Sequence, residues 1–181
     1  MSYRSFLTRF ALITCLILIV SACSSPQTLS GLGVKPLIPE QFFNGDLVAS
    51  GVVKNRSGRV IRTFNADIKA HWQDGHGTLE EDFIFNDGSE QRRVWKLAPQ
   101  PDGSYIGSAG DVTGIAEIRV DGIQMNLDYL LQVPINGRSL DIKIDDRMYL
   151  VSDDLLLNES RMTKFGITVG YIFLAIRKLD S

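Results

Sequence analysis

Residues 59–72 read RVIRTFNADIKAHW, and apolar and polar side chains alternate along them with a period of two. One face carries Val60, Arg62, Phe64, Ala66, Ile68, Ala70 and Trp72, and the other carries Ile61, Thr63, Asn65, Asp67, Lys69 and His71. This alternation predicts a β-strand with one dry and one wet face. Residues 123–133 repeat the pattern, which favours an antiparallel sheet covered on a single side.

Turn signals built on Gly, Asn and Asp recur at short intervals between such segments. They are Asn55-Arg56-Ser57-Gly58, Asp74-Gly75-His76-Gly77, Asn86-Asp87-Gly88, Pro101-Asp102-Gly103, Asp121-Gly122, Asn136-Gly137 and Asp153-Asp154. Gly supplies positive φ, while Asn and Asp tolerate it and form local hydrogen bonds. We therefore expect nine or ten strands with tight connections, preceded by a short helix within residues 39–44.

An open sheet of this size would leave two edges and a large apolar face in water. Closing the sheet into an up-and-down barrel removes the edges and buries the apolar face. We therefore predict an all-β antiparallel barrel of about eight to ten strands, with a two-sheet β-sandwich as the alternative. Residues 164–178 are apolar on both faces and contain Gly166 and Gly170, so we expect them to form the closing strand.

The N-terminus has the pattern of a bacterial lipoprotein leader. Arg4 and Arg9 precede an apolar run of eleven residues, 10–20, and Ser21-Ala22-Cys23 follows it. A helix needs roughly 20 apolar residues to span a bilayer, so a short uncleaved anchor is the weaker alternative. We expect a signal peptide at residues 1–22, lipid on Cys23, a lipidated tether at 23–38 and a barrel domain at 39–181.

The residue after the cysteine and the cysteine count indicate where the chain works. Ser24, rather than Asp, follows Cys23, which resembles the signal for the outer membrane, with the protein facing the periplasm. Cys15 would leave with the leader and Cys23 would carry the lipid. No thiol would then remain for a disulfide, a cysteine nucleophile or a cysteine metal site.

The overall charge limits the classes of partner. Cleavage before Cys23 would leave 159 residues with 17 basic and 21 acidic side chains, a net charge of −4. Nucleic-acid binding needs a basic footprint, which this composition lacks. The same balance argues against wide contact with anionic lipid.

Three charged residues fall on predicted apolar faces. Arg62, Glu81 and Arg93 lie on consecutive strands, so they can meet inside the barrel. Two arginines and one glutamate would leave a positive surplus, suited to an anionic head group such as a fatty-acid carboxylate or a lipid phosphate. With Trp95 and Tyr129 they are the candidate ligand-binding residues. A structural salt-bridge network, or bulges that turn the charges to water, are the alternatives.

Other titratable residues give weaker signals. The run Glu80-Glu81-Asp82 is expected to be mainly solvated, and Asp145-Asp146 and Asp153-Asp154 are interpreted as turn residues rather than metal ligands. His71 and His76 flank one turn, and no Gly-x-Ser-x-Gly elbow accompanies them. We therefore expect no catalytic residue, metal or cofactor.

Several strings occur in an order that resembles a known family. They are Asp82-Phe83, Asn86-Asp87-Gly88, Gln91-Arg92-Arg93-Val94-Trp95, the run at 107–116, Asp145-Asp146-Arg147-Met148-Tyr149-Leu150 and Met162-Thr163-Lys164-Phe165-Gly166. Together they resemble the proteobacterial lipoprotein family known as domain of unknown function 3833, over residues 42–178. Arg147 departs from the aromatic residue expected there. The resemblance implies a lipocalin-like (calycin-type) barrel and a lipid anchor, but no activity.

These observations lead to three hypotheses. The first is a non-enzymatic, membrane-anchored protein that holds a small apolar or amphipathic ligand, such as a fatty acid or lipid, in its barrel. The second is an envelope scaffold whose barrel is filled and which binds another protein through its surface. The third is a hydrolase or isomerase that uses the Arg62, Glu81 and Arg93 cluster.

Overall fold

Glycine-containing turns divide the chain into ten antiparallel strands within residues 35–135 and 137–179, the part that this computed structural model describes. The strands are β1 (Gly45–Asn55), β2 (Val60–Gln73), β3 (His76–Phe85), β4 (Glu90–Pro99), β5 (Tyr105–Ser108), β6 (Val112–Asp121), β7 (Gln124–Ile135), β8 (Arg138–Ser152), β9 (Leu155–Lys164) and β10 (Ile167–Lys178). One short helix, α2 (Pro39–Phe42), precedes them. The helix lies within the residues predicted for it.

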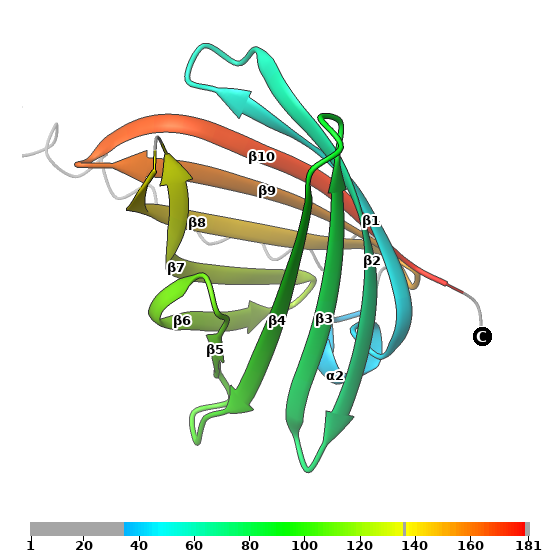
Figure 1. Cartoon of the computed structure of the whole chain (residues 1–181). Helices are drawn as coiled ribbons and strands as arrows, with labels where there is room; N and C mark the ends of the chain where they lie inside the picture. The colour runs from blue at the N-terminus through cyan, green and yellow to red at the C-terminus, as the bar shows by residue number, and fades with distance from the viewer. Residues whose placement is uncertain (1–34, 136, 180–181) are drawn as a thin grey trace, which may run out of the picture.

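The sheet closes on itself. Each strand pairs with the next in sequence, and β10 returns to pair with β1 from Leu47 opposite Lys178 to Asn55 opposite Gly170. Figure 1 shows the resulting ring of strands. The closed up-and-down barrel is the predicted architecture, and it excludes the β-sandwich. Closure pairs the edges that an open sheet would expose.

The seam between β1 and β10 depends on two glycines. A Cβ on Gly170 would lie 2.5 Å from the carbonyl oxygen of Lys54, and one on Gly51 would lie 2.5 Å from the ring of Phe64. A real Cβ does not approach another heavy atom so closely. The prediction that β10 closes the barrel through close backbone packing is confirmed.

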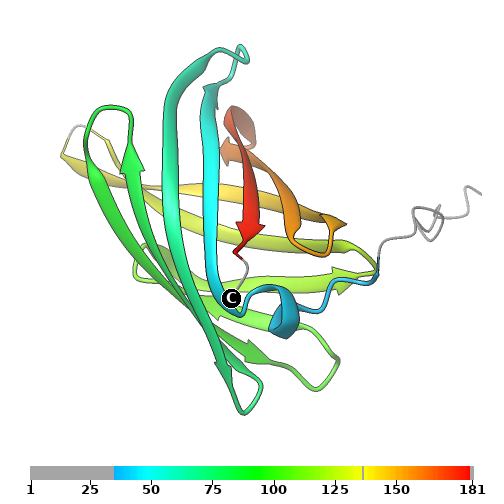
Figure 2. The same cartoon turned by 90° about the vertical axis from the view of Figure 1, so that its right-hand side faces the viewer.

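One end of the barrel is filled and covered. The helix α2 brings Phe42 and Phe43 onto the core, and the indole Nε1 of Trp72 donates a hydrogen bond to the carbonyl oxygen of Phe43 at 2.6 Å. Figure 2 shows α2 beside the start of β1 at this end. The last residues of the expected tether also pack here. Leu37 is buried, and its N–H donates to the carbonyl oxygen of Gly122 at 2.8 Å.

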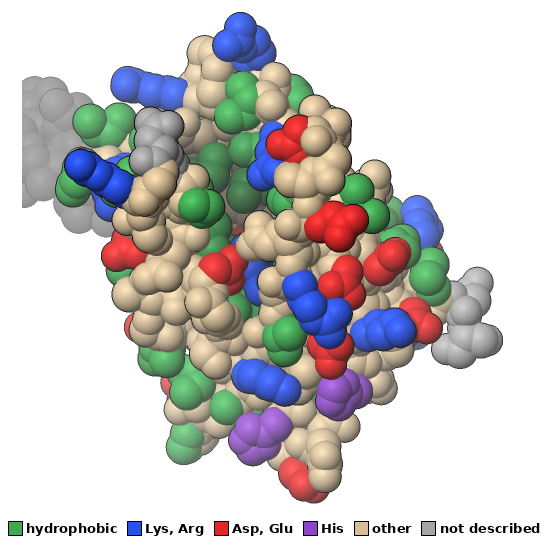
Figure 3. Space-filling model, in the orientation of Figure 1, with side chains coloured by type: hydrophobic (Ala, Val, Ile, Leu, Met, Phe, Trp, Pro, Cys, Tyr) green, Lys and Arg blue, Asp and Glu red, His purple; other side chains and the backbone are tan. Residues whose placement is uncertain are grey.

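The other end is open. On β2 the inward side chains Ala70, Ile68 and Ala66 are buried, whereas the Arg62 side chain nearer the opposite end is 36% exposed. The inward residues Met125 and Leu127 of β7 are likewise buried, and the following inward residues Tyr129, Leu131 and Val133 are partly exposed. The surface is hollowed at this end, with hydrophobic side chains deep in the hollow (Figure 3). We call this region the open half of the barrel.

The N-terminal predictions concern residues that are not described. Cys23, the signal peptide at 1–22 and tether residues 23–34 lie outside the described residues. In the part of the chain that is described, no helix is long and apolar enough to cross a membrane.

Candidate functional site

Glu81 and Arg93 face each other on the inner wall. Period-two alternation turns both side chains inward from β3 and β4, and the register places them directly opposite. Arg93 Nη1 lies 3.8 Å from Glu81 Oε2, which is too far for a good hydrogen bond. Asp111, just before β6, takes the closer contacts: it accepts from Arg93 Nη2 at 2.7 Å and from Nε at 3.0 Å. Arg93 is therefore neutralised by Asp111 more directly than by Glu81.

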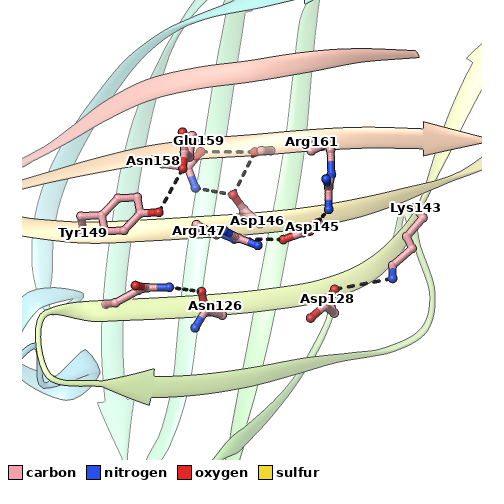
Figure 4. Close-up of polar contacts among 12 residues, drawn as sticks. Asn126, Asp128, Lys143, Asp145, Asp146, Arg147, Tyr149, Asn158, Glu159 and Arg161 are labelled. Carbon is pink, nitrogen blue, oxygen red and sulfur yellow. Dashed lines mark hydrogen bonds and ion pairs between the residues drawn. The ribbon is translucent and has the colours of Figure 1, made fainter. Parts of the chain in front are cut away.

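A third carboxyl lies across the barrel on β8. Asp146 is buried and accepts hydrogen bonds from Asn158 Nδ2 and, at 2.9 Å, from Ser160 Oγ, both on β9. Figure 4 shows Asp146 turned toward Asn158 between these two strands. Across the barrel, the charge of Asp146 raises the pKa of Glu81, and the charge of Arg93 lowers the pKa of Asp146. The residues on the two walls are therefore electrostatically coupled. We call this group the inner polar cluster: Glu81, Arg93, Asp111, Tyr129, Asp146, Asn158 and Ser160.

Burial dominates the electrostatics of the cluster. It raises the pKa of Glu81 to about 7, because desolvation outweighs the attraction of Arg93, and the carboxylates of Asp111 and Asp146 raise it further. Burial also raises the pKa of Asp146 to about 6, against the hydrogen bonds from Asn158 and Ser160. The cluster thus holds three carboxyl groups and one guanidinium. Glu81 Oε2 is buried and has no hydrogen-bond partner among the described residues.

Aromatic side chains surround the cluster. Trp95 is buried below it and meets the Tyr129 ring edge to face, with ring centroids 5.4 Å apart. On the open side, the guanidinium of Arg93 lies 5.5 Å from the centre of the Phe83 ring, and Phe83 stacks on Phe85. Four of the candidate ligand-binding residues, Glu81, Arg93, Trp95 and Tyr129, therefore lie together in the structure, and their binding of a ligand stays a prediction. They form the floor of the open half.

Arg62 is not part of this cluster. Its Nη2 lies 3.1 Å from Asp87 Oδ2 in the β3–β4 turn, and its guanidinium lies 3.4 Å from the centre of the Phe85 ring. Glu81 pairs with Ile68 of β2, six residues from Arg62, which is about 20 Å along the strand. The expectation that Arg62 meets Glu81 and Arg93 is wrong, because side chains that all point inward can lie at different positions along the barrel axis.

The predicted positive surplus is also wrong. Asp87 neutralises Arg62 at the mouth, and Asp111 neutralises Arg93 inside. Glu81 and Asp146 then add further carboxyl groups to the interior. The interior is rich in acceptors and carries no excess of positive charge.

Four members of the cluster were missed from the sequence: Asp111, Asp146, Asn158 and Ser160. Asp145-Asp146 was interpreted as a turn, yet both residues lie within β8, with Asp145 outside and paired with Arg161 at 2.6 Å. The alternation of Ile142, Ile144, Asp146 and Met148 carried the signal that Asp146 points inward. Asp111 follows an irregular connection, so no period could place it.

The remaining candidates lie on the outer wall. Glu80 and Asp82 face solvent and both pair with Arg92, as expected for solvated charge. His71 and His76 are exposed near the β2–β3 turn. Within residues 35–135 and 137–179, no three His, Cys, Asp or Glu side chains come together as a metal site would require.

A closed antiparallel up-and-down barrel with one covered end and one open end is a lipocalin-like fold. The chain belongs to the family described as "Protein of unknown function (DUF3833)", which it matches over residues 17–178. This match confirms the family resemblance of its sequence strings. No curated protein matches the chain.

Solved structures share the fold at low sequence identity. An S-type phycobiliprotein lyase from Guillardia theta has a TM-score of 0.57 and 12% identity, over 80% of this chain and 95% of that one. A protein of unknown function from the DUF3598 family of Nostoc punctiforme has a TM-score of 0.55 and 13% identity, over 80% of this chain and 51% of that one. At these identities the likeness supports the barrel fold alone.

Proposed function

We propose that this protein holds one small amphipathic ligand, such as a lipid or fatty acid of the bacterial envelope, inside its barrel. A lipid on Cys23 would tether it to the membrane, at the outer membrane facing the periplasm. The observation that carries the proposal is the open half, whose apolar wall ends on a buried polar cluster. Ligand sites are typically apolar cavities with a few polar groups that fix orientation.

The open half suits an apolar body. Inward side chains near the mouth remain partly exposed; they are Phe83, Phe85, Leu131, Met162, Ile172 and Leu174. An apolar ligand that covers them removes this surface from water, at about 25 cal/mol per Å². Aromatic rings predominate on the β2–β3 side, where Phe64, Phe83 and Phe85 lie within 6.2 Å of one another between ring centroids.

The floor of the open half favours a ligand that donates a hydrogen bond. Glu81 Oε2 is buried without a partner, and carboxyl groups outnumber the guanidinium in the cluster. An unpartnered buried acceptor costs free energy that a donor on the ligand would recover. An alcohol, amide or ammonium head group therefore fits better than a carboxylate, which would have to displace Asp111 from Arg93 or bind protonated.

The first experiment identifies the ligand. The protein is purified from membranes in mild detergent, and its extractable lipids are identified by mass spectrometry against an equal preparation of an unrelated lipoprotein. Displacement of a fluorescent lipid then compares palmitic acid, hexadecanol and hexadecylamine. We expect the amine and the alcohol to displace the probe at lower concentration than the acid. A protein that carries no enriched lipid and binds no probe would contradict the proposal and favour the filled scaffold.

A matched pair of variants tests the orientation of the ligand. Glu81→Gln removes the inward carboxyl, and Glu80→Gln removes its outward neighbour on the same strand. A lost hydrogen bond to a charged group is worth about 1.5–3 kcal/mol, so Glu81→Gln should weaken binding of hexadecylamine at least about tenfold. Glu80→Gln should bind as the wild type does. Equal affinities in both variants would place the head group elsewhere.

A second candidate function is acid–base catalysis at the same residue. It is favoured by one observation, the pKa of Glu81 near 7, where a carboxyl group can both give and take a proton. It predicts that the ligand recovered from membranes is altered when it is returned to fresh protein. Glu81→Gln should abolish this change while the ligand still binds, whereas a carrier returns the ligand unaltered.

A further inference from the structure

Three neighbouring hairpins form one side of the barrel mouth. They join β1 to β2, β9 to β10 and β7 to β8, and they are adjacent because β1 pairs with β10 and β8 with β9. Their tips, residues 54–61, 164–169 and 137–140, contain five basic residues and no acidic one. The basic residues are Lys54, Arg56, Arg59, Arg138 and Lys164. We call these three tips the basic rim.

The basic rim also exposes large apolar side chains. Phe165 is 90% exposed, and four others are between 37% and 56% exposed: Val60, Ile61, Leu140 and Ile167. In Figure 3 basic side chains stand at the upper extremities of the molecule with hydrophobic side chains beside them. Arg56, Arg59 and Arg138 form no ion pair with any residue in the described ranges. The basic rim therefore offers free cations next to uncovered apolar groups.

Phe165 has a left-handed backbone conformation that bulky residues rarely adopt. It has φ of 50° and is followed by Gly166 at 75°, so both central residues of this tight turn are left-handed. The turn at the opposite end of the barrel places Asp74 and Gly75 at nearly the same angles, 51° and 75°. Asp, Asn and Gly tolerate that conformation, whereas it costs a bulky residue about 1 kcal/mol or more. Phe165 is both strained and exposed, so the stability of the fold does not account for it.

The turns at the opposite end of the barrel carry acidic residues. They are residues 73–76, 99–105, 121–124 and 152–155, and they contain five Asp and no Lys or Arg. Asp153 and Asp154 are paired with Lys35 and Arg177, so Asp74, Asp102 and Asp121 give this end its acidic character. The β3–β4 tip at the mouth is acidic and borders the β1–β2 tip, because β3 pairs with β2, but Asp87 is paired there with Arg62. The tips of the other two rim hairpins lie farther from it around the mouth.

We propose that the basic rim docks on an anionic lipid bilayer, with Phe165 and its apolar neighbours inserted at the headgroup level. Apolar side chains flanked by Lys and Arg are the pattern of interfacial membrane binding. Each basic side chain near an anionic leaflet contributes about 1 kcal/mol. Docking in this way turns the mouth of the barrel toward the lipid. The inference stands independently of what the barrel holds.

Vesicle binding tests the proposal. The mature chain, residues 23–181 with Cys23→Ser, lacks both the leader and the lipidation site, and it is sedimented with vesicles of phosphatidylcholine alone or mixed with phosphatidylglycerol. We expect binding to the mixed vesicles to be about tenfold stronger and to weaken as salt is raised. Arg56→Glu combined with Arg59→Glu should lower binding about tenfold or more.

Phe165→Asn separates a functional role from a structural one. Asn relieves the left-handed strain, so the variant should melt at or above the wild-type temperature. Its binding to the mixed vesicles should nevertheless fall several-fold, because the inserted ring is lost. A role in folding alone would instead give a lower melting temperature or unchanged binding.

Two substitutions near the acidic end are the matched controls. Val151→Ser removes an exposed apolar side chain, and Arg119→Glu reverses an exposed charge that pairs with Glu117. Both should bind vesicles within about twofold of the wild type. Rim variants that bind like the wild type, or controls that lose as much as the rim variants, would overturn the proposal. So would equal binding to both kinds of vesicle.

Discussion

The side chain of Glu81 is 14% exposed and sits within reach of one cation, Arg93, and two other carboxyl groups. Burial raises its pKa to about 7, above the value of 4.5 expected for an unfolded chain. The folded protein therefore binds a proton at Glu81 that the unfolded chain has released between these two values. Over that window the stability must fall as the pH rises.

The prediction is a loss of stability between pH 5 and pH 8 that Glu81→Gln reduces. At about 1.4 kcal/mol per pKa unit, Glu81 accounts for roughly 2 kcal/mol of the decrease. The variant should keep only the pH-dependent loss of stability that Asp146 causes. The pKa of Asp146 is raised to about 6, so its share of the loss is complete at a lower pH than that of Glu81. Urea unfolding at both pH values measures the difference. Glu80→Gln, on the outer face, should lose as much stability between the two pH values as the wild type does. An equal loss in Glu81→Gln would show that Glu81 is not desolvated.

Arg93 and Arg92 are neighbours in sequence but differ in environment. The Arg93 side chain is 16% exposed between Asp111 and Glu81, whereas Arg92 lies in solvent between Glu80 and Asp82. Arg93→Met leaves two carboxyl groups without their cation, so it should destabilise the protein by about 2–4 kcal/mol. Arg92→Met should change the free energy of unfolding far less. Chemical denaturation compares the pair, and similar losses would contradict a buried ion pair at Arg93.

Single residues show what the sequence could predict about the site. Alternation identified Glu81, Arg93, Trp95 and Tyr129 as inward, and the structure brings them together. It failed for Arg62, because period two gives the face of a residue and not its height in the barrel. Height depends on the register between strands, which shifts at irregular points such as Val53/Lys54 in β1.

At the scale of elements, turn chemistry predicted most of the strand boundaries. The seven signals based on Asn, Asp and Gly all lie at junctions between strands, where most of their glycines have positive φ. Asp145-Asp146, also interpreted as turn residues, lies inside β8 instead. The β9–β10 turn carries no such signal before its glycine, since Phe165 occupies the position where Asn or Asp is usual. Turn signals missed the β5–β6 connection as well as the β9–β10 turn, and the β9–β10 turn is the one for which the structure suggests a second role.

The seam between β1 and β10 gives a prediction at this scale. Gly170→Ala would place a Cβ 2.5 Å from both the Lys54 carbonyl oxygen and the Met162 side chain, so the two strands must move apart. Overpacking of this kind typically costs about 1–3 kcal/mol. Gly110→Ala is the control, because a Cβ there meets nothing within 4 Å. Thermal unfolding should show a clear loss for Gly170→Ala and almost none for Gly110→Ala; equal melting temperatures would mean that the seam is loose.

For the whole molecule, the described end of the tether, residues 35–38, and the basic rim lie at opposite ends. The chain enters the barrel at the acidic end, where Leu37 bonds to Gly122 and Lys35 pairs with Asp153. The fourteen-residue β2, tilted as barrel strands are, corresponds to a barrel length of about 35 Å. The fourteen residue-to-residue steps from Cys23 to Leu37 reach at most about 50 Å. A lipid on Cys23 and the rim can therefore meet the same bilayer only if most of this reach is used.

Shortening the tether should prevent the lipid on Cys23 and the basic rim from contacting the same bilayer at once. Deletion of residues 25–31 cuts the reach to about 25 Å, less than the barrel length. The deleted protein should stay in the membrane through Cys23, while its rim leaves the lipid. The mature lipidated chain is expected to have no free thiol, so Ile61→Cys at the rim and Ser104→Cys at the far end can each carry an environment-sensitive dye.

In proteoliposomes the dye at Ile61→Cys should report an apolar surrounding that is lost on deletion, and the dye at Ser104→Cys should report water in both proteins. Cys23→Ser in the undeleted mature chain, residues 23–181, should abolish lipid incorporation and release most of the protein from the membrane, because a rim of five basic residues binds reversibly. An unchanged rim signal after deletion would mean that the rim and the lipid do not share one bilayer. The lipid anchor would then determine only the membrane in which the protein is located, and the basic rim would face a different surface.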